Sequence, residues 1–304
     1  MYGQKTDLKN LLERYLQYCV CIRNYAPETI KSYREIFRYF VSSTKVVYLE
    51  ELTKPLFEAW FFHGRLERKW TSATFRHYHK RFNAFFKWLV KESIVEKNIL
   101  ADIELPKMEQ RLPKTLTKEE STLILDMSYH MKYPYKFEKF RNRAMLALML
   151  LAGLRISEVV HLKLHDVSFE SRTIFIHQGK GSKDRMIPMN MKLCSILEEY
   201  LKDRNRLKKS SIFFFTAVQK DLGITKRAIT NNIKVIRERL KIPFSAHTLR
   251  HAFARLMLEG GCDIYTLSKL MGHARITTTT IYLSCSNMQM AKSVEMHSLN
   301  SILT

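Results

Sequence analysis

The stretch HTLRHAFARLMLEGG, residues 247–261, puts two histidines and an arginine on one short turn and continues into an apolar pattern. His247 and Arg250 are three residues apart, so a helix presents them on the same face. Phe253 and Leu256 follow at the spacing of side chains that bury a helix in a core. The stretch therefore predicts polar side chains held in place by a buried helix.

The charge of the chain indicates a polyanionic partner. The 304 residues include 51 lysines and arginines against 29 acidic residues, a net charge of +22. Nucleic acid is the simplest partner for such an excess, although charge alone is also compatible with a structural ribosome-like role or with a membrane surface. Residues up to Arg111 carry +7 and the remainder +15. Both parts can therefore contact the same polyanion.

The same composition predicts a cytoplasmic protein. The five cysteines are odd in number and lack paired zinc-ligand spacing, which is typical of reduced thiols in the cytosol. The first residues are charged and lack the apolar segment of a signal peptide. The longest apolar run, residues 144–152, is too short to span a bilayer. We expect no membrane partner.

The first part of the chain, residues 1–104, reads as helical. Apolar residues recur at helical spacing over residues 8–19, and Pro27 and Pro55 suit the first turns of two further helices. Thr71 caps a fourth helix, whose apolar side is aromatic. Its opposite side is basic and is either a solvated face or a phosphate-contacting one. We take its DNA-binding residues to be Arg76, Lys80 and Arg81.

A proline-containing segment, residues 105–115, predicts a linker to the second part. Thr117 and Glu120 then form a capping box, and a buried helix over residues 141–153 ends at Gly153. Two short strands form a hairpin whose turn contains Gly179 and Gly181, and Pro188 keeps the second strand at a sheet edge. We assign the strands to residues 172–177 and 184–189, and a further helix to 224–240. The predicted fold is mainly α with a small antiparallel β-sheet, in two basic lobes that suit a clamp around a DNA duplex.

Four separate clusters of the second part carry groups that can act on a phosphodiester. They are Arg155, Lys180, His247 with Arg250, and His273 with Tyr282. Two guanidinium groups can grip one phosphate, a lysine can donate a proton to a leaving oxygen, and a tyrosine hydroxyl is a usable nucleophile. Each has an ordinary alternative: an ion pair of Arg155 with Glu158, a solvated turn lysine, a helix-capping histidine and a core aromatic.

Taken together and in this order, the clusters resemble the tyrosine recombinases, the phage integrase family, and most closely their Xer-like branch. The motifs that carry the resemblance are AGLRISEVVHLKLHDV, GKGSKDRMIPM, FSAHTLRHAFARLMLEGG and SKLMGHARITTTTIYL. They span Arg155 to Tyr282, and the helical N-terminal region resembles the core-binding domain of the family. No catalytic position departs from the family pattern. His273 occupies a position where some relatives carry tryptophan.

The resemblance implies a site-specific recombinase that needs no metal and no cofactor. Tyr282 attacks phosphorus and forms a 3′-phosphotyrosyl link, while Lys180 protonates the departing 5′ oxygen. Arg155, Arg250 and His273 stabilise the phosphorane. His247 acts as an acid or base, and Glu158 orients Arg155.

The resemblance also implies the domain roles and the partners. Residues 1–104 are the core-binding domain, 116–288 the catalytic domain, and the apolar tail 289–304 docks on a neighbouring protomer. The expected partners are double-stranded DNA with an inverted-repeat site and a homo-tetramer, with a second recombinase or accessory protein left open. Further DNA-binding residues are expected in the hairpin and in the helix over 224–240. They are Lys183, Lys226 and Arg227.

Two other functions remain open from the sequence. A type IB topoisomerase-like enzyme would use the same chemistry without exchanging partners, and the apolar tail favours a recombinase over it. A non-catalytic DNA-binding protein would retain the fold without needing the complete set of catalytic residues. Within recombination, the sequence leaves open chromosome dimer resolution and integration or excision of a mobile element.

Overall fold

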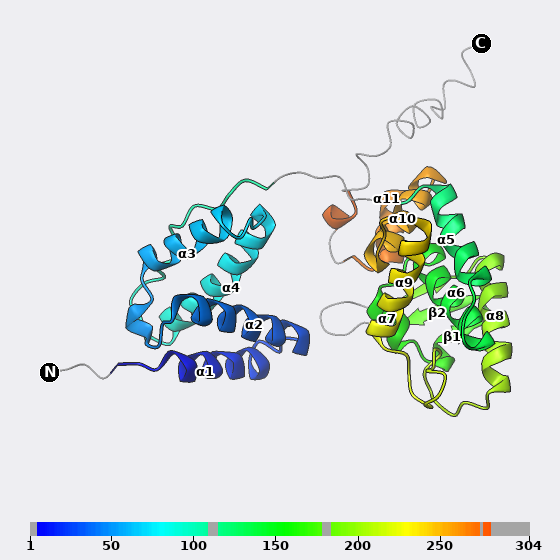
Figure 1. The fold of residues 1–304 in the computed structure, drawn as a ribbon, viewed down its shortest axis with the longest axis horizontal. Helices are drawn as coiled ribbons and strands as arrows, with labels where there is room; N and C mark the ends of the chain where they lie inside the picture. Colours follow the sequence, from blue (N-terminus) through cyan, green and yellow to red (C-terminus); the bar gives the residue numbers. More distant parts are fainter. Residues whose placement is uncertain (1–4, 109–114, 178–183, 274–275, 281–304) are drawn as a thin grey trace, which may run out of the picture. The chain divides into compact units, whose positions relative to one another are not determined.

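The computed structural model describes residues 5–108, 115–177, 184–273 and 276–280. It divides into two compact units, residues 1–111 and 112–304, each of which is described by itself (Figure 1). The predicted fold class is confirmed, because the described elements are helices together with one small antiparallel sheet. No helix among the described residues is long and apolar enough to cross a bilayer.

The first unit is a set of helices around an aromatic core. Its elements are α1 (Leu8–Cys21), α2 (Pro27–Thr44), η1 (Leu49–Glu51), α3 (Lys54–Leu66) and α4 (Ser72–Lys91). Thr71 caps α4 as predicted, through its hydroxyl and the backbone N–H of Thr74. The rings of Phe40 and Phe57 stack 4.8 Å apart between centroids, and Phe82 packs against both. The aromatic side chains of α2, α3 and α4 therefore form one buried cluster.

The second unit contains the remaining helices. They are α5 (Lys118–His130), α6 (Lys136–Leu151), α7 (Ile156–His161), η2 (Leu164–Asp166), α8 (Met191–Arg206), α9 (Lys226–Leu240), α10 (Ala246–Glu259), α11 (Ile264–Met271) and η3 (Ile276–Thr278). The capping box of Thr117 and Glu120 at the start of α5 is confirmed. Helix α6 begins at Lys136, five residues before the predicted position, and Phe137 in the added turn is buried.

The sheet contains one strand more than predicted. Strands β1 (Val167–Ser168), β2 (Thr173–Ile176) and β3 (Arg185–Pro188) pair antiparallel in the order β1-β2-β3. Both predicted strands are shorter than expected by one residue at each end, and β1 is too short for a periodic signal. Pro188 lies on an edge strand of the described sheet, as its missing N–H requires. The predicted glycine turn lies outside the described residues.

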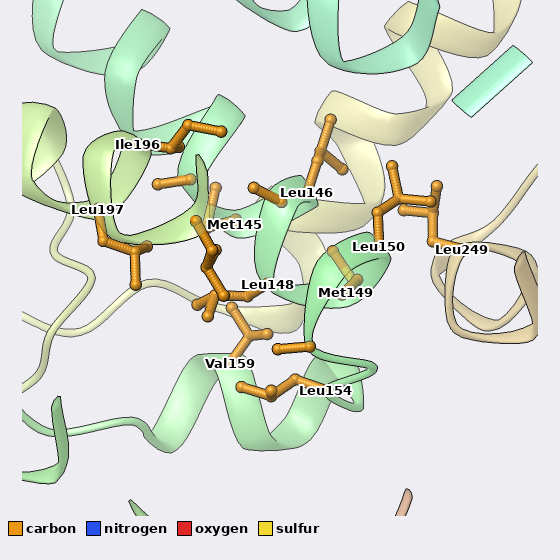
Figure 2. Packing of buried hydrophobic residues seen from close by; sticks show 14 of the residues in the cluster. Met145, Leu146, Leu148, Met149, Leu150, Leu154, Val159, Ile196, Leu197 and Leu249 are labelled. Atoms are coloured by element: carbon orange, nitrogen blue, oxygen red, sulfur yellow. The ribbon is translucent and has the colours of Figure 1, made fainter. Parts of the chain in front are cut away.

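Helix α6 lies at the centre of the second core. Leu148 and Met149 are fully buried on it, and Figure 2 shows side chains of α7, α8 and α10 around the same helix, among them Val159, Leu197 and Leu249. The helix ends at Leu151, and Gly153 turns the chain with a φ of +64°. The loop that follows carries Arg155 to the N-cap of α7. The buried helix thus fixes the start of the candidate site.

Candidate active site

Glu158 lies at the centre of a group of arginines from distant parts of the chain. Its Oε1 accepts hydrogen bonds from Arg155 Nη1 at 2.7 Å and from Arg185 Nη1 at 3.0 Å. Its Oε2 accepts from Arg185 Nη2 at 2.9 Å and from the backbone N–H of Arg155 at 2.8 Å. Arg250 Nη1 lies 3.8 Å from the same Oε2. Burial alone would raise the pKa of Glu158, but the bonds from Arg185 and Arg155 outweigh burial and lower it.

The C-terminal end of α11 holds the same three arginines from the other side. Arg185 Nε donates to the carbonyl of Leu270 at 2.8 Å, and Arg155 Nη2 donates to that of Gly272 at 3.2 Å. Arg250 Nη2 donates to the intervening carbonyl, that of Met271. Free carbonyls at a helix C-terminus carry partial negative charge and attract cations. The helix end and Glu158 together therefore fix the positions of the guanidinium groups.

The three arginines differ in their access to solvent. The side chain of Arg155 is 37% exposed, whereas those of Arg185 and Arg250 are 7% and 4% exposed. Three guanidinium groups against one carboxylate leave a net charge of +2 on these four side chains. Arg155 therefore carries positive charge on the solvent-exposed side of the group, and Arg185 and Arg250 carry theirs in its buried part.

Three histidines adjoin the arginines and are neutral near pH 7. Partial loss of solvation, with Arg250 and Arg155 nearby, lowers the pKa of His247, although the residue keeps an exposed surface. Burial and the neighbouring His247 lower the pKa of His251 to about 4, and the two rings lie 4.2 Å apart between centroids. Burial and Arg250 lower the pKa of His273 to about 4. A neutral imidazole can accept a proton, which a general base requires.

His273 has a defined tautomer in this arrangement. Its Nε2 lies 3.4 Å from Arg250 Nη2, which can only donate. The proton of the neutral ring is therefore on Nδ1, which lies 2.7 Å from the hydroxyl of Thr279. Thr279 is fully buried. Its hydroxyl thus determines the orientation of the ring.

Helix α10 shows how residues 247–261 place polar side chains at the site. Ser245 caps the helix, and Phe253 is buried, whereas Leu256 is only partly so. Arg250 lies on the inner side of the helix and donates to the carbonyl of Gly153. His247 is exposed on the preceding turn. Arg250 therefore lies in the interior of the site and His247 at its surface. Their spacing on one helix face did not predict this difference.

The structure brings together four of the six predicted catalytic residues. Arg155, His247, Arg250 and His273 form the group described above. Lys180, Lys183 and Tyr282 lie outside the described residues. Arg185 and Thr279 belong to the group as well, although neither was among the predicted site residues. Their only sequence signal was membership of two motifs, DRMIPM and ITTTTIYL.

The predicted DNA-binding residues of α4 have mixed surroundings. Lys80 is exposed. Arg76 is half-buried and donates through Nε to the carbonyl of Pro106 at 2.8 Å. The guanidinium of Arg81 lies 4.4 Å from the ring centroid of Tyr33. Two of these three side chains therefore have partners within the unit, unlike a freely solvated basic face.

Helix α9 exposes a basic face. Lys226 and Arg227 are exposed in its first turn, while Ile229, Ile233 and Ile236 are buried on the other side. This pattern is that of an amphipathic surface helix. Contact of these residues with DNA stays a prediction.

The chain matches two known domain families. Residues 114–288 match the phage integrase family, and residues 11–96 match the N-terminal SAM-like domain of phage integrases. The chain is 31% identical over 298 residues to tyrosine recombinase XerD of Listeria monocytogenes, covering 93% of this chain and 96% of the relative. It is 32% identical over 214 residues to tyrosine recombinase XerA of Pyrococcus horikoshii, covering 70% and 69%.

Solved structures share the fold. The integrase of transposon Tn1549, in complex with circular intermediate DNA, has a TM-score of 0.77 at 17% identity and covers 95% of this chain and 99% of its own. The XerH recombinase bound to its difH substrate has a TM-score of 0.71 at 23% identity, covering 94% and 83%. Domain matches, relatives and fold agree: the chain belongs to the phage integrase family, the tyrosine recombinases, and is similar to their Xer members.

Proposed function

We propose that the protein is a site-specific DNA recombinase whose active site is the arginine group around Glu158. The net charge of +2 on Arg155, Arg185, Arg250 and Glu158 is the observation that supports this most directly. A phosphodiester carries one negative charge and its phosphorane carries two, so the electrostatic attraction grows as the reaction proceeds. Groups held in place before the reaction stabilise such a charge without reorganising.

The cleavage step uses residues that the structure describes and two that it does not. The Tyr282 hydroxyl attacks phosphorus and gives its proton to neutral His247, a P–O bond to tyrosine forms, and the P–O5′ bond breaks. Lys180 supplies the proton of the departing 5′ oxygen. Arg155 and Arg250 hold the non-bridging oxygens, and His273, which lies beside Arg250, completes this side of the site. One P–O bond replaces another, so the step needs no ATP.

Rejoining reverses the same step. The 5′ hydroxyl of a partner strand attacks the phosphotyrosyl phosphorus and releases Tyr282. This transfer exchanges strands through a Holliday junction. We propose double-stranded DNA with an inverted-repeat site as substrate and a homo-tetramer as the active assembly, joined by residues 289–304. The DNA complexes of XerH and of the Tn1549 integrase, and the similarity to XerD over nearly the full length, support this substrate class. A DNA substrate also favours the cytoplasm.

Covalent trapping on genomic DNA tests the proposal. Sheared DNA of the host is incubated with the protein, the reaction is stopped with SDS, and the ends of protein-linked fragments are sequenced. The control is Tyr282→Phe, which lacks the nucleophile and retains the ring. We expect adducts that collect at one inverted-repeat site and that disappear in the control.

The other outcomes point to different functions. Adducts scattered over the genome would favour a nicking-closing enzyme of the topoisomerase type. Absence of adducts, with DNA binding retained, would contradict a recombinase that acts alone. The position of the site, in the chromosome itself or at the ends of a mobile element, distinguishes chromosome dimer resolution from integration or excision.

A further inference from the structure

We propose that His165, Asp166 and His177 form a binding site for a first-row transition-metal ion such as Zn²⁺. His165 and Asp166 end η2, and His177 follows β2 directly. Asp166 and His177 line one pocket together with His161 and Lys163, and a side-chain nitrogen of His165 lies within 4.8 Å of the ligand atoms of both. Arg155 and Glu158 line the same pocket, so the site adjoins the arginine group, whose proposed cleavage chemistry uses no metal.

Two of the three separations between the ligand atoms are already close to those around a bound metal ion. Asp166 Oδ1 is 3.0 Å from His177 Nε2 and 3.4 Å from His165 Nε2. All three atoms lie within 4.8 Å of one another. Zinc binds imidazole nitrogen and carboxylate oxygen at about 2.0–2.2 Å, so two ligands of one tetrahedral ion are about 3.3–3.5 Å apart. Small rotations of the two rings bring the set to that geometry.

The carboxylate is fixed in advance. The Asp166 side chain is 3% exposed, and its Oδ2 accepts the backbone N–H of Lys163 at 2.8 Å. Oδ1 is therefore directed at the imidazoles. The histidine side chains are 68% and 55% exposed, so they can turn toward an ion while water occupies the fourth position.

The chemistry of the site favours a transition metal over other ligands. A buried carboxylate at its centre repels phosphate and other anions. Two imidazole nitrogens with one carboxylate suit Zn²⁺, Co²⁺ or Ni²⁺, whereas Mg²⁺ and Ca²⁺ prefer oxygen ligands. Arg155 and Lys163 are the cations that line the pocket, and Arg155 is paired with Glu158 at 2.7 Å, which reduces its repulsion of a metal ion.

The site also has a structural consequence. A metal ion would join η2 to the end of β2, which now interact through the contact of His177 Nε2 with Asp166 Oδ1. Lys180 follows His177 by three residues in the sequence. Metal binding is therefore expected to fix the position of His177, three residues before the proposed general acid.

Titration of the full-length protein with Co²⁺ tests the proposal. The protein is first stripped with EDTA, Co²⁺ is added, and its visible absorption is followed before displacement by Zn²⁺. We expect one saturable site in the wild-type protein. The variant His165→Ala/His177→Ala should lose that site, with an affinity lower by at least about 100-fold. Asp166→Asn should weaken it while its amide oxygen still accepts from Lys163.

A matched control removes two other exposed imidazoles. His63 lies on α3 and His130 at the end of α5, and both are exposed. The variant His63→Ala/His130→Ala should bind Co²⁺ like the wild type. Equal binding by the wild type and His165→Ala/His177→Ala, no saturable site in the wild type, or an equal loss in the control would overturn the proposal. Circular dichroism verifies that every variant is folded.

Discussion

Arg185 Nη2 lies 2.9 Å from Glu158 Oε2, and both side chains are less than a tenth exposed. The two residues are 27 positions apart and come from a strand and a helix. Glu158 therefore links the sheet to α7, and it also binds the more exposed Arg155. A carboxylate in this position both stabilises the fold and holds Arg155 of the candidate active site in place.

Removing the charge of Glu158 should destabilise the protein strongly. Glu158→Gln leaves buried Arg185 and Arg250 without their carboxylate, and loss of one partner of a buried ion pair costs about 3 kcal/mol or more. Glu13→Gln is the matched control, because Glu13 pairs with Arg34 where both side chains are about half exposed and should lose under about 1 kcal/mol. Urea unfolding of both variants gives the comparison. Equal losses would contradict a central role for Glu158.

The neutral histidines predict that stability falls as pH drops. The pKa of His251 and of His273 is about 4 in the folded chain, against about 6.5 when unfolded. The unfolded chain then binds more protons between these values, so the free energy of unfolding decreases from about pH 6.5 down to pH 4. The depressed pKa of Glu158 removes further stability as pH falls below about 4.3.

His273→Asn isolates one of these contributions. Asparagine keeps a donor near the position of Nδ1 and removes the titrating ring. The loss of unfolding free energy between pH 7 and pH 5 should be smaller for this variant than for the wild type. Parallel pH profiles would show that His273 is not held neutral.

Gly153 allows the close approach of α10 to the end of α6. An added Cβ would lie 2.4 Å from the ring of Phe253, and φ is +64°. Gly153→Ala should therefore cost about 3 kcal/mol, from overpacking and from backbone strain. Gly261 has a φ of +94° with no atom within 4 Å of an added Cβ. Gly261→Ala then reports strain alone, about 1–2 kcal/mol, and an equal loss in thermal or urea unfolding would exclude the steric contribution.

Thr279 should act as a positioning residue for His273. Thr279→Val removes the hydroxyl 2.7 Å from Nδ1 and keeps the side-chain shape. Single-turnover DNA cleavage should slow about 5–30-fold, the equivalent of about 1–2 kcal/mol for a lost hydrogen bond. Thr279→Ser should recover most of the rate. If the valine variant cleaves at the wild-type rate, or if serine fails to restore it at equal stability, the hydroxyl does not position the ring.

The C-terminal tail should matter for assembly and not for binding. Deletion of residues 289–304 removes the apolar positions Met290, Val294 and Leu299. Binding of a single site in a gel-shift experiment should be retained, while formation of the synaptic complex and recombination decrease. Unchanged recombination by the truncated protein would remove this assignment.

Local signals predicted the helices well, and they predicted part of the site. Periodicity located the buried helix before Gly153, and the capping signals of Thr71 and Thr117 placed two helix starts to the residue. The i,i+3 spacing also predicted the pair of Arg155 and Glu158, because both ends lie within one helical turn.

Long-range contacts were not predictable in the same way. Arg185 reads as an ordinary strand residue, and its partners are 27 and 85 positions away. The depth of Arg250 depends on the carbonyls at the end of α11, which no local pattern specifies. Strand β1 has only two residues, too few to show the alternation of buried and exposed side chains that identifies a strand. Tertiary packing decides all three.

Identification of the residue joined to DNA tests the central claim most directly. Trapped adducts are digested with nuclease and trypsin, and peptides that retain a nucleotide are sequenced by mass spectrometry. Trypsin releases Tyr282 in the peptide of residues 276–292. Of the 14 tyrosines of the chain, this peptide contains Tyr282 alone. We predict a 3′-phosphate link on Tyr282, lost in Arg155→Ala as in Tyr282→Phe. A link on another residue, or adducts that persist in Tyr282→Phe, would contradict the proposed mechanism.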